Sequence, residues 1–277
     1  MSRRMGNNNT NPIAREVIKM TEHKDIVLLA IYAGEILLRN GAETYRVEDT
    51  INRICYYRGV DFAETFVTPT GLIVSVDNKE SHPVTIIRKI TRRETNLTKV
   101  SAVNAFSRRF VSGKISIDEG MAELKAIDRQ DLGYSHVRVF LSGGVAAGAA
   151  AVLLGGSWDD FFPALLVAFV IRIVLSTITL FRFSLFLDAY VAGFTAAITG
   201  FLLIKLGWGQ HLSEIITGAL VPLFPGVALT NSIRDFITGD LQSGTVRGVE
   251  ALLAAGALAG GVGIGLSIFV TFLEKVI

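Results

Sequence analysis

Residues 222–240 read PLFPGVALTNSIRDFITGD and lie between long apolar segments. Two prolines, Pro222 and Pro225, and the adjacent Gly226 are followed by a group of polar residues at 230–235. Proline removes a backbone donor and breaks a helix, and backbone groups left unpaired in lipid are costly unless protein or water satisfies them. The stretch therefore predicts an irregular backbone that lines a cavity. The alternative is a proline kink followed by an ordinary interfacial loop.

Charge is distributed unevenly along the 277 residues. The first 131 residues contain 37 Lys, Arg, Asp and Glu, whereas the last 146 contain 15. This contrast predicts a water-soluble domain at residues 24–131 and a membrane domain at residues 132–277. The polar start, residues 1–23, lacks the apolar core of a signal peptide and is predicted to be a disordered tail.

The C-terminal half contains five apolar segments close to the roughly 20 residues that a membrane-spanning helix needs. They cover about 137–154, 161–180, 185–206, 212–229 and 249–272, with a longer connector at 231–248. The predicted fold is a membrane all-α bundle of five transmembrane helices, preceded by a small cytoplasmic α+β domain. The cytoplasmic assignment follows from the positive-inside rule, because one side of the bundle receives Arg129, Arg138, Arg182, Arg234 and Arg247.

The soluble half alternates between two periodicities. Helical spacing at 25–39 and after Thr44 gives way to strand alternation at 62–66, 72–76 and 84–90, and helical spacing returns at 97–112 and 117–129. We expect Thr44 to cap the second helix. The polar stretch GAETYRVED, residues 41–49, serves either capping and solvation or contact with the membrane half or a partner.

Several classes of function are disfavoured by composition. A single cysteine excludes an internal disulfide and cysteine-based metal motifs, and no P-loop, GxSxG or HExxH motif is present. We therefore expect no metal, no cofactor and no catalytic site; an intramembrane hydrolase lacks an evident nucleophile–base pair. A net charge of +2 without a basic, aromatic-rich patch argues against nucleic acid as a partner.

Ionisable residues inside apolar segments indicate functional positions, because a charge within the bilayer must face protein or water. Arg172 and Asp188 lie at similar depth in consecutive segments, so we expect them to pair or to share water, either for function or only to fix helix register. Around the broken segment, we expect substrate contacts from Pro225, Gly226, Thr230, Asn231 and Arg234. The expected proton carriers are Asp235, Asp240 and Glu250.

Small residues four positions apart mark helix-packing faces. Such pairs occur in the first span at Gly144 and Gly148, and in the fifth at Gly256 with Gly260 and Gly261 with Gly265. They serve packing within the chain or contact with another subunit, which includes a second copy of this chain.

Five pieces in order give the chain a resemblance to a known family. They are GAETYRVED (41–49), TPTGLIVSV (68–76), TNLTKVSAVN (95–104), GGSWDD (155–160) and LFPGVALTNSIRDFITGDLQSG (223–244). The sequence resembles the threonine/serine exporter family in its N-terminal-half form. The resemblance implies a proton-driven exporter in the bacterial inner membrane, with threonine, serine or a dicarboxylate such as succinate as substrate. Because the chain stops after the fifth span, the resemblance also implies a separately encoded small membrane partner.

A rival interpretation comes from a different class of protein. It is a membrane-anchored signalling or scaffold protein that acts through its cytoplasmic domain. It predicts that Arg234→Ala leaves metabolite efflux unchanged, whereas deletion of residues 1–131 abolishes function.

Overall fold

The computed structural model describes residues 12–60, 62–78, 81–91, 93–130, 134–178 and 185–273. The chain divides into two compact units. The first, here called the α+β unit, comprises Met1–Gly133 together with Arg234–Ser243. The second, here called the helical unit, comprises Tyr134–Ile233 and Gly244–Ile277. The short segment Arg234–Ser243 therefore belongs to the N-terminal unit although it is distant in sequence.

The α+β unit has the predicted order of helix, helix, three strands, helix and helix. Its elements are α1 (Pro12–Arg39), α2 (Thr44–Tyr57), β1 (Phe62–Thr68), β2 (Gly71–Asn78), β3 (Ser81–Lys89), α3 (Leu97–Val111) and α4 (Ile117–Arg129). Helix α1 begins at Pro12, inside the range predicted as a disordered tail, so the helix is longer than expected. Residues 1–11 of that predicted tail lie outside the described residues.

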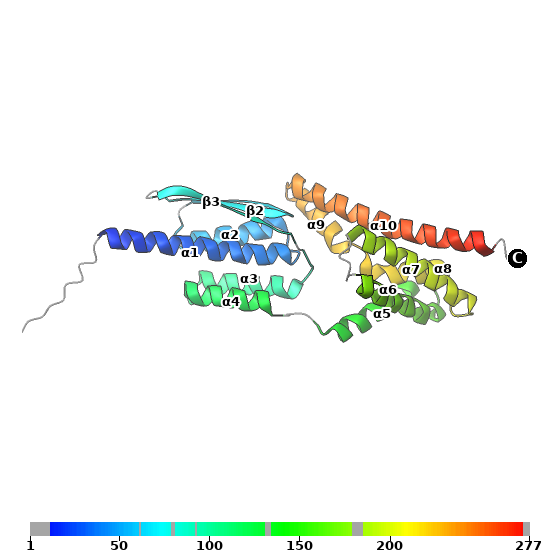
Figure 1. Ribbon diagram of the computed structural model, residues 1–277. Coiled ribbons are helices and arrows are strands. Elements are labelled where there is room, and N and C mark those ends of the chain that lie inside the picture. Colours follow the sequence, from blue (N-terminus) through cyan, green and yellow to red (C-terminus); the bar gives the residue numbers. More distant parts are fainter. Residues whose placement is uncertain are drawn as a thin grey trace, which may run out of the picture. The chain divides into compact units, whose positions relative to one another are not determined.

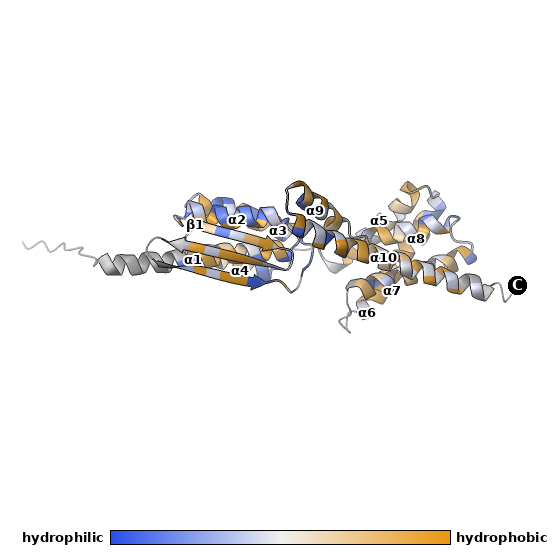
Figure 2. Cartoon of the chain, turned by 90° about the horizontal axis from the view of Figure 1, so that it is seen from above, coloured by the Kyte–Doolittle hydropathy of each residue, from blue (hydrophilic) through white to orange (hydrophobic). Residues whose placement is uncertain are grey.

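The sheet of this unit is antiparallel in the order β1-β2-β3. Side chains alternate between its faces, and Figure 2 shows polar and apolar residues alternating along the strands. Val67, Leu72 and Val74 point into the core and are buried. Helices α1 and α2 form the layer beneath this face, and α3 with α4 forms the next layer (Figure 1). One sheet face is thus covered by helices, as predicted.

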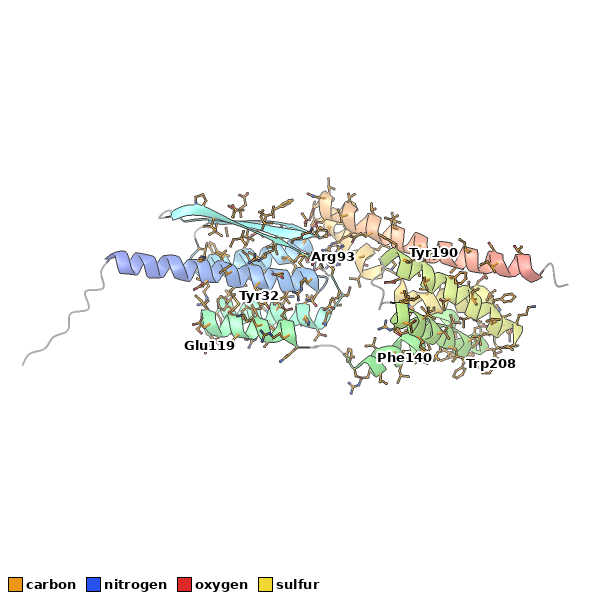
Figure 3. All side chains as sticks on the ribbon, viewed as in Figure 1. Tyr32, Arg93, Glu119, Phe140, Tyr190 and Trp208 are labelled. Carbon is orange, nitrogen blue, oxygen red and sulfur yellow. The ribbon has the colours of Figure 1, made fainter. Side chains whose placement is uncertain are left out.

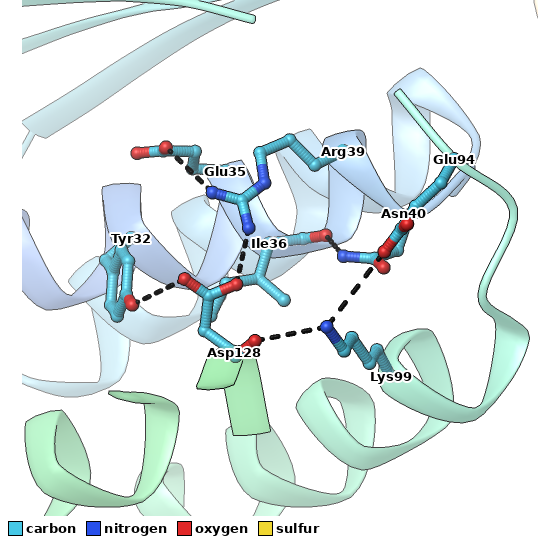
Figure 4. A network of polar contacts seen from close by, with 8 residues as sticks. All are labelled: Tyr32, Glu35, Ile36, Arg39, Asn40, Glu94, Lys99 and Asp128. Atoms are coloured by element: carbon cyan, nitrogen blue, oxygen red, sulfur yellow. Dashed lines mark hydrogen bonds and ion pairs between the residues drawn. The ribbon is translucent and has the colours of Figure 1, made fainter. Parts of the chain in front are cut away.

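A polar network joins three helices of the α+β unit (Figure 4). The Asp128 carboxylate at the end of α4 accepts hydrogen bonds from Tyr32 Oη (2.9 Å) and from Arg39 (2.5 Å) on α1. Lys99 Nζ on α3 donates to the Asp128 carbonyl at 3.1 Å. Burial and the hydrogen bond to Asp128 raise the pKa of Tyr32 to about 12. The network fixes α4 against α1 and α3 beneath the sheet.

The helical unit is built from apolar helices. They are α5 (His136–Leu153), α6 (Phe161–Ile178), α7 (Leu185–Lys205), α8 (Leu212–Leu220), α9 (Gly226–Ile237) and α10 (Leu241–Leu273), with short 3-10 turns η1 (Trp158–Asp160) and η3 (Val221–Leu223). Helix α9 passes from this unit into the α+β unit after Ile233, and α10 returns from it at Gly244.

By length and composition, three described helices could cross a membrane: Trp158–Ile178, Phe186–Lys205 and Leu241–Ile268. A fourth span is formed if the bent pair Leu212–Leu223 and Gly226–Ile237 counts as one. The first predicted span corresponds to Val137–Leu153, which is apolar but shorter than the others. The chain is therefore mostly helical with three to four candidate spans, and the count of five stays a prediction.

The break predicted at the prolines is present. Helix α8 ends at Leu220, η3 adds one tight turn, and α9 starts at Gly226 with a bend of 63° between the two helices. Phe224, which precedes Pro225, has the extended backbone that proline imposes on the residue before it. The predicted connector at 231–248 is wrong, because α9 continues to Ile237 and α10 already begins at Leu241. No helix breaker occurs between Gly226 and Gly239, so the polar residues of this stretch are helical.

Two of the three small-residue pairs pack inside the helical unit. A Cβ atom at Gly144 would meet the ring of Phe169, and one at Gly148 would meet Phe161 on α6. Gly261 and Gly265 approach the backbone of α7 in the same way. These positions favour the interpretation as packing within the chain. At Gly256, by contrast, an added Cβ would meet nothing within 4 Å among the described residues.

Candidate functional site

A small pocket lies inside the helical unit beside the broken helix. Its volume is about 140 Å³. It is lined from three sides: by α5, by α6, and by α8 with η3. The lining residues are Val139, Phe140, Gly143, Gly144, Ala168, Ile171, Arg172, Ala219, Pro222 and Leu223. The two adjacent glycines leave the space open, and Phe140, labelled in Figure 3, is held by stacking on Phe169 at 4.3 Å between ring centroids.

Arg172 is the charged residue of this pocket. It lies on α6 within the candidate span Trp158–Ile178, six residues before the end of that helix, which corresponds to about 9 Å along the axis. An arginine at the centre of such a span costs about 2.5–3.5 kcal/mol on insertion scales. Its side chain is exposed and makes no hydrogen bond or ion pair with any residue that the structure describes. The position therefore leaves a cation in a cavity with mainly apolar walls.

The direct ion pair expected between Arg172 and Asp188 is not formed in the described part of the chain. Asp188 lies on α7, half-buried, and its Oδ1 atom is buried without a hydrogen-bond partner among the described residues. The reason is direction: Arg172 lines a pocket formed with α5, α8 and η3, whereas no residue of α7 lines that pocket. Shared water, the other arrangement expected for these two residues, stays a prediction.

A second group of polar residues lies in the α+β unit, at the start of α2. The Thr44 hydroxyl is 3.0 Å from Asp235 Oδ1 and 3.0 Å from Asp240 Oδ2. The Arg234 guanidinium forms an ion pair with Glu43. Thr44 and Asp235 are buried. We refer to these five residues as the α2 polar cluster.

The α2 polar cluster corrects the role predicted for Thr44. Glu43, not Thr44, occupies the N-cap position of α2, and no side chain caps the helix there. The Thr44 hydroxyl is instead engaged by two carboxylates from the end of α9 and the turn before α10. Of the two interpretations of GAETYRVED, contact with a distant part of the chain is therefore the one that Glu43 and Thr44 support. The signal in the sequence was the density of polar groups beside a helix start.

Charge and burial act against each other on the carboxylates around this cluster. Burial would raise the pKa of Glu43, but hydrogen bonds and charge attraction from Arg46, together with the bond from Arg234, hold that pKa below its ordinary value. Glu48, one turn further along α2, shows the opposite result. Burial and, to a smaller extent, the nearby Asp240 charge raise its pKa, although its carboxylate accepts a hydrogen bond from the Val67 N–H.

The remaining predicted site residues are spread along α9 and α10. Pro225 and Gly226 are half-buried where α9 begins, Thr230 is exposed, and Asn231 is buried. Glu250 is half-buried on α10. None of the predicted substrate contacts lines the pocket, which the preceding Pro222 and Leu223 reach instead.

The sequence led us to expect no metal site, and a metal site would need several His, Cys, Asp or Glu side chains close together. Within the described ranges, no group of three or more His, Cys, Asp or Glu side chains is placed to hold a metal ion. The buried carboxylate Asp160 is saturated by donors, since it accepts from Ser157, from the backbone N–H groups of Gln210 and His211, and from the His211 ring. It fixes η1 against the loop between α7 and α8 rather than offering an open ligand.

Apolar helices of membrane-spanning length, with a pocket beside a broken helix, place the chain among α-helical membrane proteins. A family model described as "Putative threonine/serine exporter" (ThrE) matches residues 28–269. The chain belongs to this threonine/serine exporter family, as its sequence motifs predicted.

Named relatives agree with this family. The chain is 27% identical to "Threonine/serine exporter" of Corynebacterium glutamicum over 91% of its own length and 53% of the relative. It is 25% identical to "Probable threonine/serine exporter" of Mycobacterium tuberculosis (strain ATCC 25618 / H37Rv), over 86% of its length and 45% of the relative. It is 23% identical to "Probable succinate transporter subunit YjjP" of Escherichia coli (strain K12), over 90% of its own length and 96% of the relative.

The relatives differ in how much of their length is matched. The chain spans about half the length of the two exporter relatives and nearly all of the succinate transporter subunit. No solved structure matches the chain.

Proposed function

We propose that this chain is a subunit of a proton-coupled exporter of small carboxylate-bearing metabolites: threonine and serine, or a dicarboxylate such as succinate. One observation carries the proposal beyond family membership. The break between α8 and α9 turns Pro222 and Leu223 toward a pocket that also holds Arg172. Broken helices at membrane depth are tolerated where they line a cavity, and transporters use them at binding sites.

The proposed placement is a bacterial inner membrane, with five spans and the α+β unit in the cytoplasm. The shortest of the five, Val137–Leu153, has the length at the lower limit for a span, about 17 residues. A companion membrane subunit is supported by one relative that is itself named a transporter subunit and is matched over nearly its full length. Gly256, at which nothing described lies close, is a candidate contact on α10 for that companion or for a second copy.

The proposed substrate contacts share a helix face. Gly226, Thr230 and Arg234 follow one another at four-residue spacing on α9, with Pro225 just before the helix and Asn231 beside the stripe. Thr230 and Arg234 are exposed on this face. Since Arg234 pairs with Glu43, a substrate carboxylate would share the guanidinium with Glu43 or displace it.

Proton coupling is proposed for Asp235, Asp240 and Glu250, and the α2 polar cluster supports the first two. A threonine hydroxyl has a single hydrogen to donate. With carboxylate oxygens at 3.0 Å on both sides, one contact is donated by Thr44, and the other is a hydrogen bond only when that Asp is protonated. The Asp240 carboxylate accepts from the Ser243 N–H at the start of α10, which favours its charged form.

The test is efflux of labelled threonine, serine and succinate from loaded cells or vesicles. It compares preparations with and without this chain, with and without a candidate companion subunit, and with the proton gradient intact or collapsed. We expect efflux of at least one substrate to require the chain and to fall when the gradient is collapsed. The exporter proposal fails if no combination gives a substrate-dependent difference.

Two variants sharpen that experiment. Asp235→Asn is expected to uncouple efflux from the proton gradient, whereas Asp159→Asn, a matched change at an exposed carboxylate, is expected to leave the coupling intact. Orientation is tested separately with Asp77→Cys. We expect this cysteine to stay unlabelled by an impermeant thiol reagent added outside, and labelling from outside contradicts the cytoplasmic placement.

A further inference from the structure

The pocket of the helical unit is lined by a charged residue, Arg172, that no described residue of the unit balances. Among the residues that line it, Arg172 alone is charged, and no carboxylate lies among them. Arg172 has no hydrogen-bond or ion-pair partner in the part of the chain that the structure describes. Charged residues at membrane depth pair with another group or face water and commonly mark a substrate pathway.

The size and walls of the pocket limit what can supply a counter-charge. Its volume of about 140 Å³ is close to the roughly 150 Å³ of an engineered cavity that holds benzene. Val139, Phe140, Ile171 and Leu223 provide apolar walls. A single cation with apolar surroundings suits one carboxylate on a short carbon chain, because the guanidinium fork matches a carboxylate with two parallel hydrogen bonds.

We propose that this pocket is a carboxylate subsite in which Arg172 binds the carboxylate of a short-chain metabolite. The inference rests on the proposed function and deepens it, because it assigns the carboxylate contact to Arg172 in place of Arg234, which is paired with Glu43. It also has a consequence for specificity. Since no acidic residue is among the described residues that line the pocket, the subsite is expected to recognise the carboxylate of an amino acid without a charged partner for its ammonium group.

Ligand analogues test this specificity on the full purified chain in lipid nanodiscs, with ligand-induced thermal stabilisation as the measurement. The probes are succinate, threonine, 3-hydroxybutyrate, which lacks the ammonium group, and threoninol, which lacks the carboxylate. We expect stabilisation by the first three and none by threoninol or by chloride at the same concentration. Equal stabilisation by threoninol or chloride, or no stabilisation by any carboxylate, overturns the proposal.

Substitutions test whether Arg172 is the residue that binds the carboxylate. Arg172→Gln is expected to weaken carboxylate binding about 10- to 100-fold, the range for loss of a charge-assisted hydrogen bond. Arg172→Lys, which keeps the charge and loses the fork, is expected to fall between Arg172→Gln and the wild type. The matched control is Arg138→Gln, which removes an exposed arginine of α5 that does not line the pocket. Unchanged binding in Arg172→Gln refutes the assignment.

A steric variant covers the case in which Arg172→Gln does not fold. An added Cβ at Gly143 meets nothing within 4 Å, so Gly143→Leu fills the pocket without a backbone clash. We expect it to abolish carboxylate stabilisation. Gly263→Leu on α10, at an equally open position outside the pocket, is its control and is expected to bind as the wild type does. Binding retained in Gly143→Leu contradicts a site in this pocket.

Efflux measurements separate this inference from the proposed function. One outcome is that the wild-type chain binds carboxylates, Arg172→Gln loses this binding, and the wild-type chain exports nothing. That outcome supports the subsite and refutes the exporter proposal. Wild-type efflux that is unchanged in Arg172→Gln supports the exporter proposal and refutes the subsite.

Discussion

Thr44 is the residue on which the α2 polar cluster depends, and Thr44→Val removes its hydroxyl while keeping its shape. Thr44 is 1% exposed and Asp235 is 0% exposed, so water does not replace the lost donor. Leaving a buried acceptor without its hydrogen bond costs about 1–3 kcal/mol. We take about 2 kcal/mol as the expected loss of local stability at neutral pH. The loss corresponds to a roughly 30-fold change in an opening equilibrium.

Hydrogen-exchange mass spectrometry of the full chain in detergent measures this loss locally. Amides of α2 (Thr44–Tyr57) in Thr44→Val are expected to exchange about 30-fold faster than in the wild type, because exchange reports the free energy of local opening. Thr50→Val is the matched control on the same helix. The Thr50 hydroxyl is buried without a hydrogen-bond partner in the described part of the chain, so its removal is expected to leave exchange unchanged or slower.

A double-mutant cycle locates the interaction. Thr44→Val and Asp235→Asn are expected to be non-additive by about 1 kcal/mol or more, as residues in one hydrogen-bond network are. Equal exchange in Thr44→Val and wild type, or strict additivity with Asp235→Asn, refutes the role assigned to the Thr44 hydroxyl.

Three further predictions concern titratable residues. Glu43→Gln is expected to lower stability at neutral pH, because the pKa of Glu43 is depressed in the folded state. The stability that a depressed pKa provides is lost as pH falls through it, so the difference between Glu43→Gln and the wild type should close as pH falls below about 4.5. Thermal unfolding measured across this pH range checks the prediction. The ring hydrogen bond to Asp160 raises the pKa of His211, so its contribution is present below about pH 6.5 and is lost as pH rises through the folded pKa. The thermal midpoint should therefore fall more between about pH 6 and pH 9 in wild type than in His211→Asn, and parallel curves contradict the coupling. Tyr32→Phe should cost about 0.5–1.5 kcal/mol through the bond to Asp128, measured by unfolding at neutral pH. Wild-type phenolate absorbance should show one tyrosine titrating near pH 12 that Tyr32→Phe lacks.

Local patterns in the sequence were sufficient for most of the fold. The change from helical to strand periodicity predicted the element order of the α+β unit, because each period follows from backbone geometry and the burial of one face. The two prolines predicted the break before α9 for an equally local reason, since a missing backbone N–H interrupts a helix wherever it occurs. The family could likewise be recognised from the motifs alone, because recognition depended only on their residues and their order along the chain.

Which side chains meet was decided by packing between distant segments. Thr44 was predicted as a cap, yet its hydroxyl is engaged by Asp235 and Asp240, almost two hundred positions away. Arg172 and Asp188 were expected to pair or to share water because of their similar depth, but no ion pair joins them among the described residues, and Arg172 lines a pocket with α5 and η3. Depth and spacing can be read along one chain. The direction of a side chain depends on the rotation and packing of whole helices, which only the tertiary structure determines.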